Sequence, residues 1–247
     1  MSELTIRVGK LIDGTGTLAE NNVSLIIKDG QILRLEKWQK VESINQTNKT
    51  IVEFPNSVAL PGLIDCHTHT NMPANGRSGE DVIGDGDGMR LLRSARNART
   101  ALKSGVTTMC DNGAWNQTGF SLKEGIREGE VAGPNLLACG RPITITGGHL
   151  WFMGSQADGI DGVRQATRQL IKEGADFIKV IATGGSTVTS NPFRPAFTVD
   201  ELRIIREEGH SHDKMVAAHC RSNQGISRVI DAGYDGIFHA FFTDEAG

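Results

Sequence analysis

The chain has 247 residues, of which 38% are hydrophobic and 22% are charged, as in an ordinary globular protein. Its 26 basic and 29 acidic residues give a formal net charge of -3 without blocks of like charge. This balance argues against nucleic-acid or anionic-membrane binding and favours a small neutral or zwitterionic substrate. The sequence shows neither a signal-peptide stretch nor the roughly 20 apolar residues of a membrane span, so we expect a cytoplasmic protein.

The first 57 residues alternate apolar and polar side chains with a period of two, which is the pattern of half-buried β-strands. Asp29 and Gly30 interrupt the pattern and favour a turn. We therefore expect residues 1–57 to form a small antiparallel β unit. Its alternating apolar positions are Ile6, Val8, Leu11, Val23, Leu25, Ile27, Ile32, Leu33, Leu35, Ile51, Val52 and Phe54.

From Val58 onward, short apolar runs alternate with amphipathic helical stretches, which is typical of parallel strands buried on both faces. The expected strands are six runs, at residues 58–65, 106–110, 135–139, 177–181, 216–219 and 236–238. The expected helices cover residues 88–104, 161–171 and 224–231, with two more beginning at the capping boxes of Ser121 and Thr198. Gly105 and Gly174 are expected to end helices in the left-handed conformation.

Repeated β/α units form either a doubly wound sheet or a barrel, and the helix and strand patterns alone leave both open. No G-x-G-x-x-G follows the first expected strand, which disfavours a dinucleotide-binding sheet. The candidate functional residues all lie at the carboxyl ends of the expected strands, where a (β/α)8 barrel keeps its active site. We therefore predict an α/β fold of the TIM-barrel type for residues 58–247.

His67 and His69 follow an apolar run at a spacing of two, which places both imidazoles on one face of an extended strand. Two nitrogen ligands from one strand suit a metal such as zinc. A His-x-His pair alone is weak evidence, because two surface histidines have the same spacing. Here Pro61-Gly62 and Asp65 complete a longer pattern.

With these residues, the chain resembles the amidohydrolase superfamily, whose first barrel strand ends in apolar-Pro-Gly-x-x-Asp-x-His-x-His. The resemblance implies a metal-dependent hydrolase with a (β/α)8 barrel and a small β-sandwich domain built partly from the N-terminal residues.

Lys179 lies inside the apolar run of the fourth expected strand, between Ile178 and Val180. Burial disfavours the charged form of a lysine, so its pKa should be lowered and its amine available as a nucleophile. The resemblance implies that Lys179 reacts with CO2 to form a carbamate that bridges two metal ions. The alternative is a lysine that extends to the barrel rim.

His219 and His239 end the fifth and sixth expected strands. Each alone would more often be a core histidine, but the set reproduces the family's order of ligands on strands one, four, five and six. The resemblance implies two divalent ions, with zinc expected first and manganese or iron left open. His67 and His69 would hold the more buried ion, His219 and His239 the more exposed one, and Lys179 both. A bridging hydroxide would then attack a carbonyl group.

Three further residues are candidates for substrate contacts. The run from Thr146 to Leu150 is similar to that of the imidazolonepropionase-like branch, which includes the Xaa-Pro dipeptidases (prolidases), and implies that His149 contacts the substrate carbonyl or oxyanion. Arg221 is suited to bind a substrate carboxylate or to form a surface salt bridge. Arg194 either shapes the pocket mouth or is solvated.

The sequence departs from the family pattern at its C-terminal end. A complete barrel has eight strands, whereas only six are recognised here. The family's last ligand, an aspartate at the end of strand eight, has no counterpart, and Asp244 follows strand six. We therefore expect a chain truncated after strand six, an N-terminal β domain incomplete without C-terminal strands, and a homo-oligomer in the full-length protein.

The function expected from this set is cleavage of an amide or peptide bond in a small molecule, such as a dipeptide or N-acyl amino acid. One alternative is a cyclic amidohydrolase or deaminase of the same superfamily, although the mononuclear deaminases commonly lack the lysine. The other is a non-catalytic structural relative or an inactive fragment.

Overall fold

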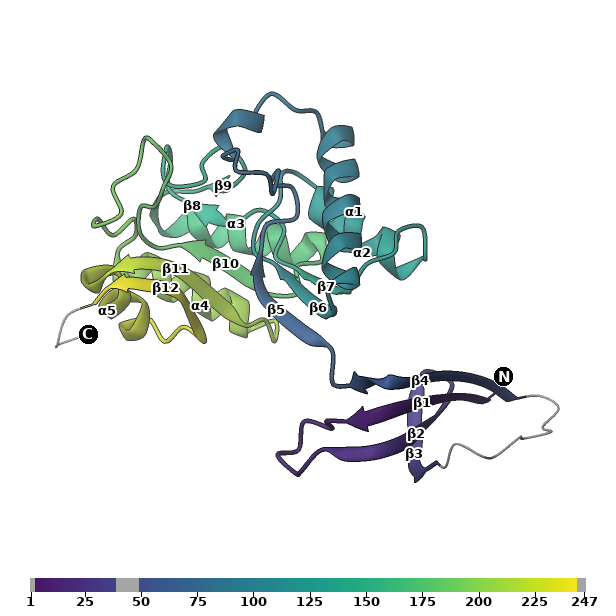
Figure 1. Ribbon diagram of the computed structural model, residues 1–247. Helices are drawn as coiled ribbons and strands as arrows, with labels where there is room; N and C mark the ends of the chain where they lie inside the picture. Colours follow the sequence, from purple (N-terminus) through teal and green to yellow (C-terminus); the bar gives the residue numbers. More distant parts are fainter. Residues whose placement is uncertain (1–2, 39–48, 244–247) are drawn as a thin grey trace. The chain divides into compact units, whose positions relative to one another are not determined.

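The computed structural model describes residues 3–38 and 49–243 and separates the chain into two units, Met1–Gly62 and Leu63–Gly247 (Figure 1). Each unit has a hydrophobic core of its own.

The first unit is a four-stranded sheet with the order β3-β2-β1-β4. Its strands are β1 (Glu3–Leu11), β2 (Glu20–Lys28), β3 (Gln31–Lys37) and β4 (Lys49–Ala59). Asp29 and Gly30 have φ angles of 52° and 77°, as a tight hairpin turn requires, so the turn expected there is confirmed. Apolar residues of β1 and β2 form the core: Val8, Leu11, Val23 and Leu25.

The expected all-antiparallel arrangement is wrong for β4, because β4 pairs in parallel with β1. The pairs β1–β2 and β2–β3 are antiparallel. Alternation of apolar residues predicts which side chains face a core, but it carries no information on the direction of the neighbouring strand. The described residues of this unit form one sheet rather than two packed layers.

The second unit is part of a parallel α/β barrel. Six of its strands correspond to the six expected runs: β5 (Leu63–Thr68), β6 (Val106–Asp111), β7 (Asn135–Ala138), β10 (Ile178–Ile181), β11 (Val216–Ser222) and β12 (Gly236–Phe242). Two short strands, β8 (Ile143–Thr144) and β9 (Ser155–Gln156), were not expected. Residues 58 and 59 belong to β4 rather than to the first barrel strand.

The strands pair in two parallel groups, β5-β6-β7 and β12-β11-β10-β8-β9. Asp176, just before β10, connects these groups. Its backbone N–H donates to Ala138 O at 2.9 Å, and its carboxylate accepts a hydrogen bond from the Ala138 N–H at 2.8 Å. Lys123 forms a salt bridge with the same carboxylate at 2.6 Å. The C-terminal end of β7 and the start of β10 are therefore held side by side.

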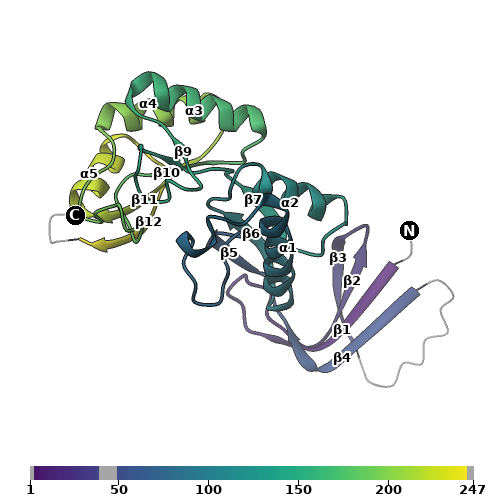
Figure 2. The same ribbon diagram turned by 90° about the horizontal axis from the view of Figure 1, so that it is seen from above.

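Helices cover the outer face of the strands. They are α1 (Asp87–Lys103), α2 (Thr118–Arg127), α3 (Gly159–Glu173), α4 (Val199–His210) and α5 (Asn223–Asp231). The short 3-10 helix η1 (Glu80–Val82) precedes α1, and its Val82 packs with Trp115, Leu150 and Ile181. Figure 2 shows α1 and α2 beside β5, β6 and β7, and α3, α4 and α5 beside β10, β11 and β12. The main core lies between these helices and strands.

The expected helix ends are partly right. The capping box at Thr198 is confirmed, because its side chain accepts from the Glu201 N–H and the Glu201 carboxylate accepts from the Thr198 N–H. Gly105 and Gly174 adopt φ angles of 93° and 100°, as predicted. The start expected at Ser121 is wrong, because α2 begins three residues earlier.

One tertiary contact accompanies the earlier start of α2. Thr118 donates to the side chain of Asn71 at 2.9 Å, which holds the first turn of α2 in helical form. Asp161 is not the cap of α3 either, because the helix begins at Gly159 and Asp161 lies in its first turn.

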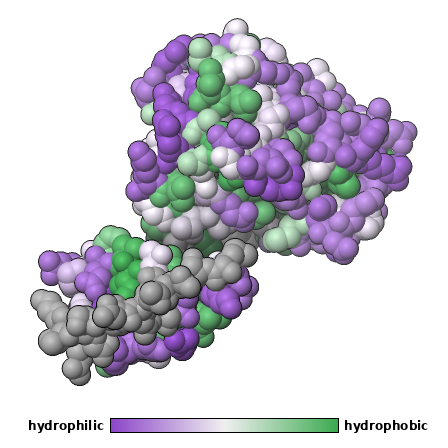
Figure 3. Space-filling view, turned by 90° about the vertical axis from the view of Figure 1, so that its right-hand side faces the viewer, coloured by the Kyte–Doolittle hydropathy of each residue, from purple (hydrophilic) through white to green (hydrophobic). Residues whose placement is uncertain are grey.

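Within the part of the chain that the structure describes, no helix is long and apolar enough to cross a membrane. Figure 3 shows hydrophobic patches within a mainly hydrophilic surface on the face it presents. Exposed large apolar side chains occur in both units, among them Leu33, Phe54, Ile64, Leu92 and Phe241.

Candidate active site

One cavity of about 340 Å³ lies at the carboxyl ends of the barrel strands. All of the predicted site residues except Arg194 line it. Arg194 is exposed in the segment before α4, where its backbone carbonyl accepts a hydrogen bond from the Gly184 N–H at 3.2 Å. The structure therefore brings together side chains from β5, β10, β11 and β12 and from the loop after β8.

Five histidine rings form a continuous chain around this cavity. Ring centroids lie 5.5 Å apart for His67 and His69, 4.9 Å for His67 and His239, and 4.6 Å for His239 and His219. His149 continues the chain, 4.7 Å from His219. The side chains predicted from separate strands are thus neighbours in space.

Backbone carbonyls determine the tautomers of two of these histidines. His69 Nδ1 lies 3.1 Å from Gly113 O, and His219 Nε2 lies 3.1 Å from Gly184 O. A carbonyl oxygen only accepts hydrogen bonds, so each of these ring nitrogens carries the proton. The other nitrogen of each ring keeps its lone pair, which is the form that a metal ligand needs.

Burial keeps these imidazoles uncharged at neutral pH. It lowers the pKa of His67 to about 3 and that of His69 to about 4, with the nearby Lys179 adding to the effect. The pKa of His219 falls to about 2, again mainly through burial, and that of His239 is lowered for the same reason. Neutral rings need not lose a proton before they bind a cation.

Lys179 is buried, with only 1% of its surface exposed, and does not extend to the barrel rim. Burial lowers its pKa to about 7, so a large fraction of the amine is neutral near pH 7. Its Nζ donates to Asn112 Oδ1 at 3.2 Å and lies 3.8 Å from the centre of the Phe238 ring. A neutral buried amine is the nucleophilic form.

Asn112, directly after β6, is a residue that the sequence reasoning missed. Its Nδ2 donates to Cys66 O at 2.9 Å and to Cys110 O at 3.2 Å, so Oδ1 is turned toward Lys179. The sequence did contain a sign of it, because Asp111 and Asn112 stand at the carboxyl end of an apolar run. The candidate histidines were recognised by the same position.

Asp111 was also missed, and it connects the segments that follow β5 and β6. Its carboxylate accepts from Thr70 Oγ1 at 2.6 Å and from the Gly113 N–H at 3.3 Å. Burial raises the pKa of Asp111 to about 6. Gly113 is the residue whose carbonyl holds His69, so Asp111 helps to position that histidine.

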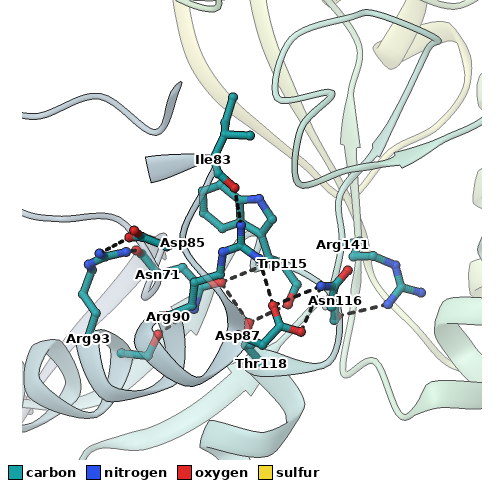
Figure 4. Close-up of polar contacts among 11 residues, drawn as sticks. Asn71, Ile83, Asp85, Asp87, Arg90, Arg93, Trp115, Asn116, Thr118 and Arg141 are labelled. Atoms are coloured by element: carbon teal, nitrogen blue, oxygen red, sulfur yellow. Dashed lines mark hydrogen bonds and ion pairs between the residues drawn. The ribbon is translucent and has the colours of Figure 1, made fainter. Parts of the chain in front are cut away.

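A packed aromatic wall lies behind the cavity. Trp115 packs with Leu150 and Ile181, both of which line the cavity. Figure 4 shows Arg90 against the indole, with Arg90 Cζ 4.8 Å from the ring centre. Asn71 accepts from the Trp115 N–H at 2.8 Å, which ties the segment after β5 to the loop after β6.

The same close-up shows how the start of α1 supports this wall. Arg90 donates to Asp87 at 2.8 Å, and Asn116 donates to the same carboxylate at 3.0 Å (Figure 4). Arg141 in turn donates to Asn116 O at 3.0 Å. Arg90 is 7% exposed, and its charge is balanced by the half-exposed carboxylate of Asp87.

The donor set fits divalent transition metals in its chemistry. Four neutral imidazoles and a partly neutral lysine surround one cavity, and imidazole nitrogen is a preferred ligand of zinc and its neighbours. Among the described residues, no group of three or more His, Cys, Asp or Glu side chains already stands at ligand spacing. The predicted ligand roles therefore stay predictions.

Comparisons with known proteins agree with this geometry. The model of the amidohydrolase family matches residues 58–247. Ochratoxinase of Aspergillus niger is 29% identical, with 97% of this chain and 55% of that protein aligned. Imidazolonepropionase of Colwellia psychrerythraea is 26% identical, with 99% of this chain and 64% of that protein aligned.

A solved structure shares the fold over nearly the whole chain. The crystal structure of a Xaa-Pro dipeptidase with methionine bound in its active site superposes with a TM-score of 0.87 at 29% identity. The match covers 99% of this chain and 63% of that one. The chain thus spans between 55% and 64% of the length of these three relatives.

Proposed function

The chain belongs to the amidohydrolase family, and from that premise we propose that it carries the metal site of a hydrolase that cleaves an amide or peptide bond in a small substrate. The observation that supports this best is the placement of buried Lys179 with four neutral histidines around one cavity. The cavity of about 340 Å³ suits a ligand of dipeptide size.

His67 and His69 would hold one metal ion, His219 and His239 a second, and carbamylated Lys179 both. When bound, the ions supply Lewis acidity and lower the pKa of a water molecule toward neutrality. Lys179 forms its carbamate by attack of Nζ on the carbon of CO2, with one amine proton passing to solvent. The lowered pKa of Lys179, about 7, supplies the neutral amine that this step requires.

His149 and Arg221 would bind the substrate. His149 lines the cavity and is suited to donate a hydrogen bond to the carbonyl oxygen as negative charge develops on it. Arg221 also lines the cavity, its Cζ lies 5.4 Å from the centre of the Phe241 ring, and its buried Nε has no hydrogen-bond partner among the described residues. A guanidinium can bind a carboxylate through two of its N–H groups at once.

The names of the relatives support a substrate with a free carboxylate. One related structure is a Xaa-Pro dipeptidase with methionine in its active site. We therefore propose dipeptides or N-acyl amino acids as the substrate class, with hydrolysis of the bond next to the carboxylate-bearing residue.

The test measures bound metal and hydrolysis together. Metal per chain is determined after loading with zinc or manganese, with and without bicarbonate, both for this chain and for a longer form that spans the length of its relatives. Panels of dipeptides, N-acyl amino acids and cyclic amides are then assayed. We expect close to two metals per chain in the longer form with bicarbonate; fewer than one, or turnover of cyclic amides alone, would contradict the proposal.

A further inference from the structure

His149 is held in the turn between β8 and β9 by contacts that determine which of its ring nitrogens carries the proton. The ring is buried, and the adjacent Leu150 has a φ angle of 58°, in the left-handed region. Such backbone persists where surrounding contacts hold it in place. The contacts come from Thr187, in the loop after β10, which is itself 4% exposed.

Three hydrogen bonds join Thr187 to this turn. The Thr187 backbone N–H donates to His149 Nδ1 at 3.3 Å. The Leu150 backbone N–H donates to Thr187 Oγ1 at 3.1 Å. The same Oγ1 lies 2.7 Å from His149 Nδ1.

Only one tautomer of His149 satisfies all three contacts. A backbone N–H cannot accept, so Nδ1 must present its lone pair to the Thr187 N–H. The Thr187 hydroxyl then accepts from Leu150 and donates its own proton to Nδ1. The imidazole proton must therefore be on Nε2. If Nδ1 carried it, two N–H groups would face each other in the interior, and one would lose its partner.

The backbone of Gly185 also lies close against the His149 ring. A Cβ atom added to Gly185 would lie 2.5 Å from both Nε2 and Cδ2 of His149. The glycine thus lets the backbone approach the ring, and the ring has little freedom to turn over. With Nδ1 bound by Thr187, Nε2–H is the only ring donor left to face a ligand in the cavity.

We propose that Thr187 is a positioning residue that fixes His149 as the Nε2–H tautomer and so makes it a hydrogen-bond donor to the substrate carbonyl oxygen. Thr187 does not line the cavity and acts only through His149. The role in hydrolysis rests on the proposed function, whereas the tautomer assignment does not.

The first experiment reads the tautomer directly. The full chain is labelled with 15N-histidine, and the His149 signals are assigned by comparison with a His149→Gln variant; the chain has only 7 histidines. We expect a protonated, pyrrole-type Nε2 and an unprotonated, pyridine-type Nδ1. A protonated Nδ1 in the unmodified chain would overturn the proposal without any variant.

The second experiment compares Thr187→Val, which keeps the shape but removes the hydroxyl, with Thr187→Ser, which keeps the hydroxyl. In Thr187→Val the backbone N–H still faces Nδ1, so we expect Nδ1 to stay pyridine-type, with its signal moved further from the protonated position by loss of the hydroxyl hydrogen bond. We expect kcat to fall by about tenfold or more with a smaller change in KM, because the ring is held by one hydrogen bond fewer. Thr187→Ser should retain both properties of the original chain. A Thr187→Val protein with unchanged His149 signals and unchanged kcat would refute the positioning role.

Failure of the proposed function gives a different result. If no panel substrate is hydrolysed by any form, the hydrolase proposal fails; the 15N signals of the unmodified chain then decide the tautomer, and those of the two Thr187 variants decide whether the hydroxyl holds Nδ1. Thermal unfolding of each variant identifies a change that reflects loss of the fold rather than of one hydrogen bond.

Discussion

Lys179 donates a hydrogen bond from Nζ to Oδ1 of Asn112, 3.2 Å away, and both side chains are sealed from solvent, with 1% and 0% of their surfaces exposed. The asparagine amide is itself oriented by two backbone carbonyls, so its oxygen has one direction available. A carbamylated lysine keeps one N–H, and the same oxygen can accept from it. Asn112 therefore presents a fixed acceptor to both forms of the lysine.

Replacing Asn112 should impair formation of the carbamate. We expect Asn112→Ala to reduce the carbamate signal seen by 13C NMR after addition of 13C-bicarbonate. Loss of its buried hydrogen bonds should also lower the free energy of unfolding by about 1–3 kcal/mol. Asn135→Ala, an exposed asparagine at the start of β7, is the matched control. A full carbamate signal in Asn112→Ala would show that the contact is not needed.

Asp111 should make the free energy of unfolding fall as the pH rises from about 4 to 6. Its folded-state pKa is raised to about 6 by burial, from 3.8, so in this window the folded chain keeps a proton that the unfolded chain releases. This loss of stability is absent at pH values below the Asp111 pKa of the unfolded chain, and it is complete at pH values above the Asp111 pKa of the folded chain. A shift of this size corresponds to about 3 kcal/mol as an order of magnitude.

The measurement compares urea unfolding of the original chain and of Asp111→Asn at pH 4, 5, 6 and 7. The amide oxygen of Asp111→Asn can accept from the Thr70 and Gly113 N–H groups, and its NH2 group can donate to the Thr70 hydroxyl oxygen, so the variant should fold. We expect the difference in stability between the two proteins to move in favour of Asp111→Asn as the pH rises. A constant difference across this range would contradict the raised pKa. Titration of the buried histidines is common to both proteins and cancels.

Gly185→Ala should displace the His149 ring, because the new methyl group would lie 2.5 Å from two of its atoms. We expect a fall in kcat/KM of about tenfold or more, since small displacements of a group that contacts the reacting atoms are costly. Gly84→Ala is the control, because a Cβ there meets nothing within 4 Å. Activity equal to that of the control variant would argue against His149 as a substrate contact.

Arg221 and Arg194 should differ in their effect on substrate binding. Arg221→Gln is expected to raise KM by about tenfold for substrates with a free carboxylate and to leave the corresponding amides unaffected, because a bidentate charged contact is lost. Arg194→Gln, outside the cavity, should leave KM unchanged for both. If the two variants behave alike, or if the amides are affected equally, Arg221 does not recognise the carboxylate.

Much of the site followed from local rules. The spacing of His67 and His69, and the position of His219 and His239 at strand ends, depend only on the period of a strand and on where parallel strands end. The burial of Lys179 followed from its apolar neighbours in one strand. The family and the barrel were predicted from these residues, and both are confirmed.

Other features required contacts between distant segments. Asn112 meets Lys179 across 67 positions of sequence, and Thr187 meets His149 across 38. No local pattern marks an asparagine or threonine as a partner of a side chain in another loop. The start of α2 was misplaced for a related reason, because Thr118 is held by Asn71, 47 positions away.

The sequence by itself determined the kinds of donor in the site and the strands that carry them, because strand period and burial are properties of short segments. The tertiary structure alone decided that β4 runs parallel to β1, that Arg194 lies outside the cavity while Arg221 lines it, and which nitrogen of His69, His149 and His219 is free. A tautomer depends on the hydrogen-bond partner of the other ring nitrogen, and that partner comes from a segment brought close only by folding.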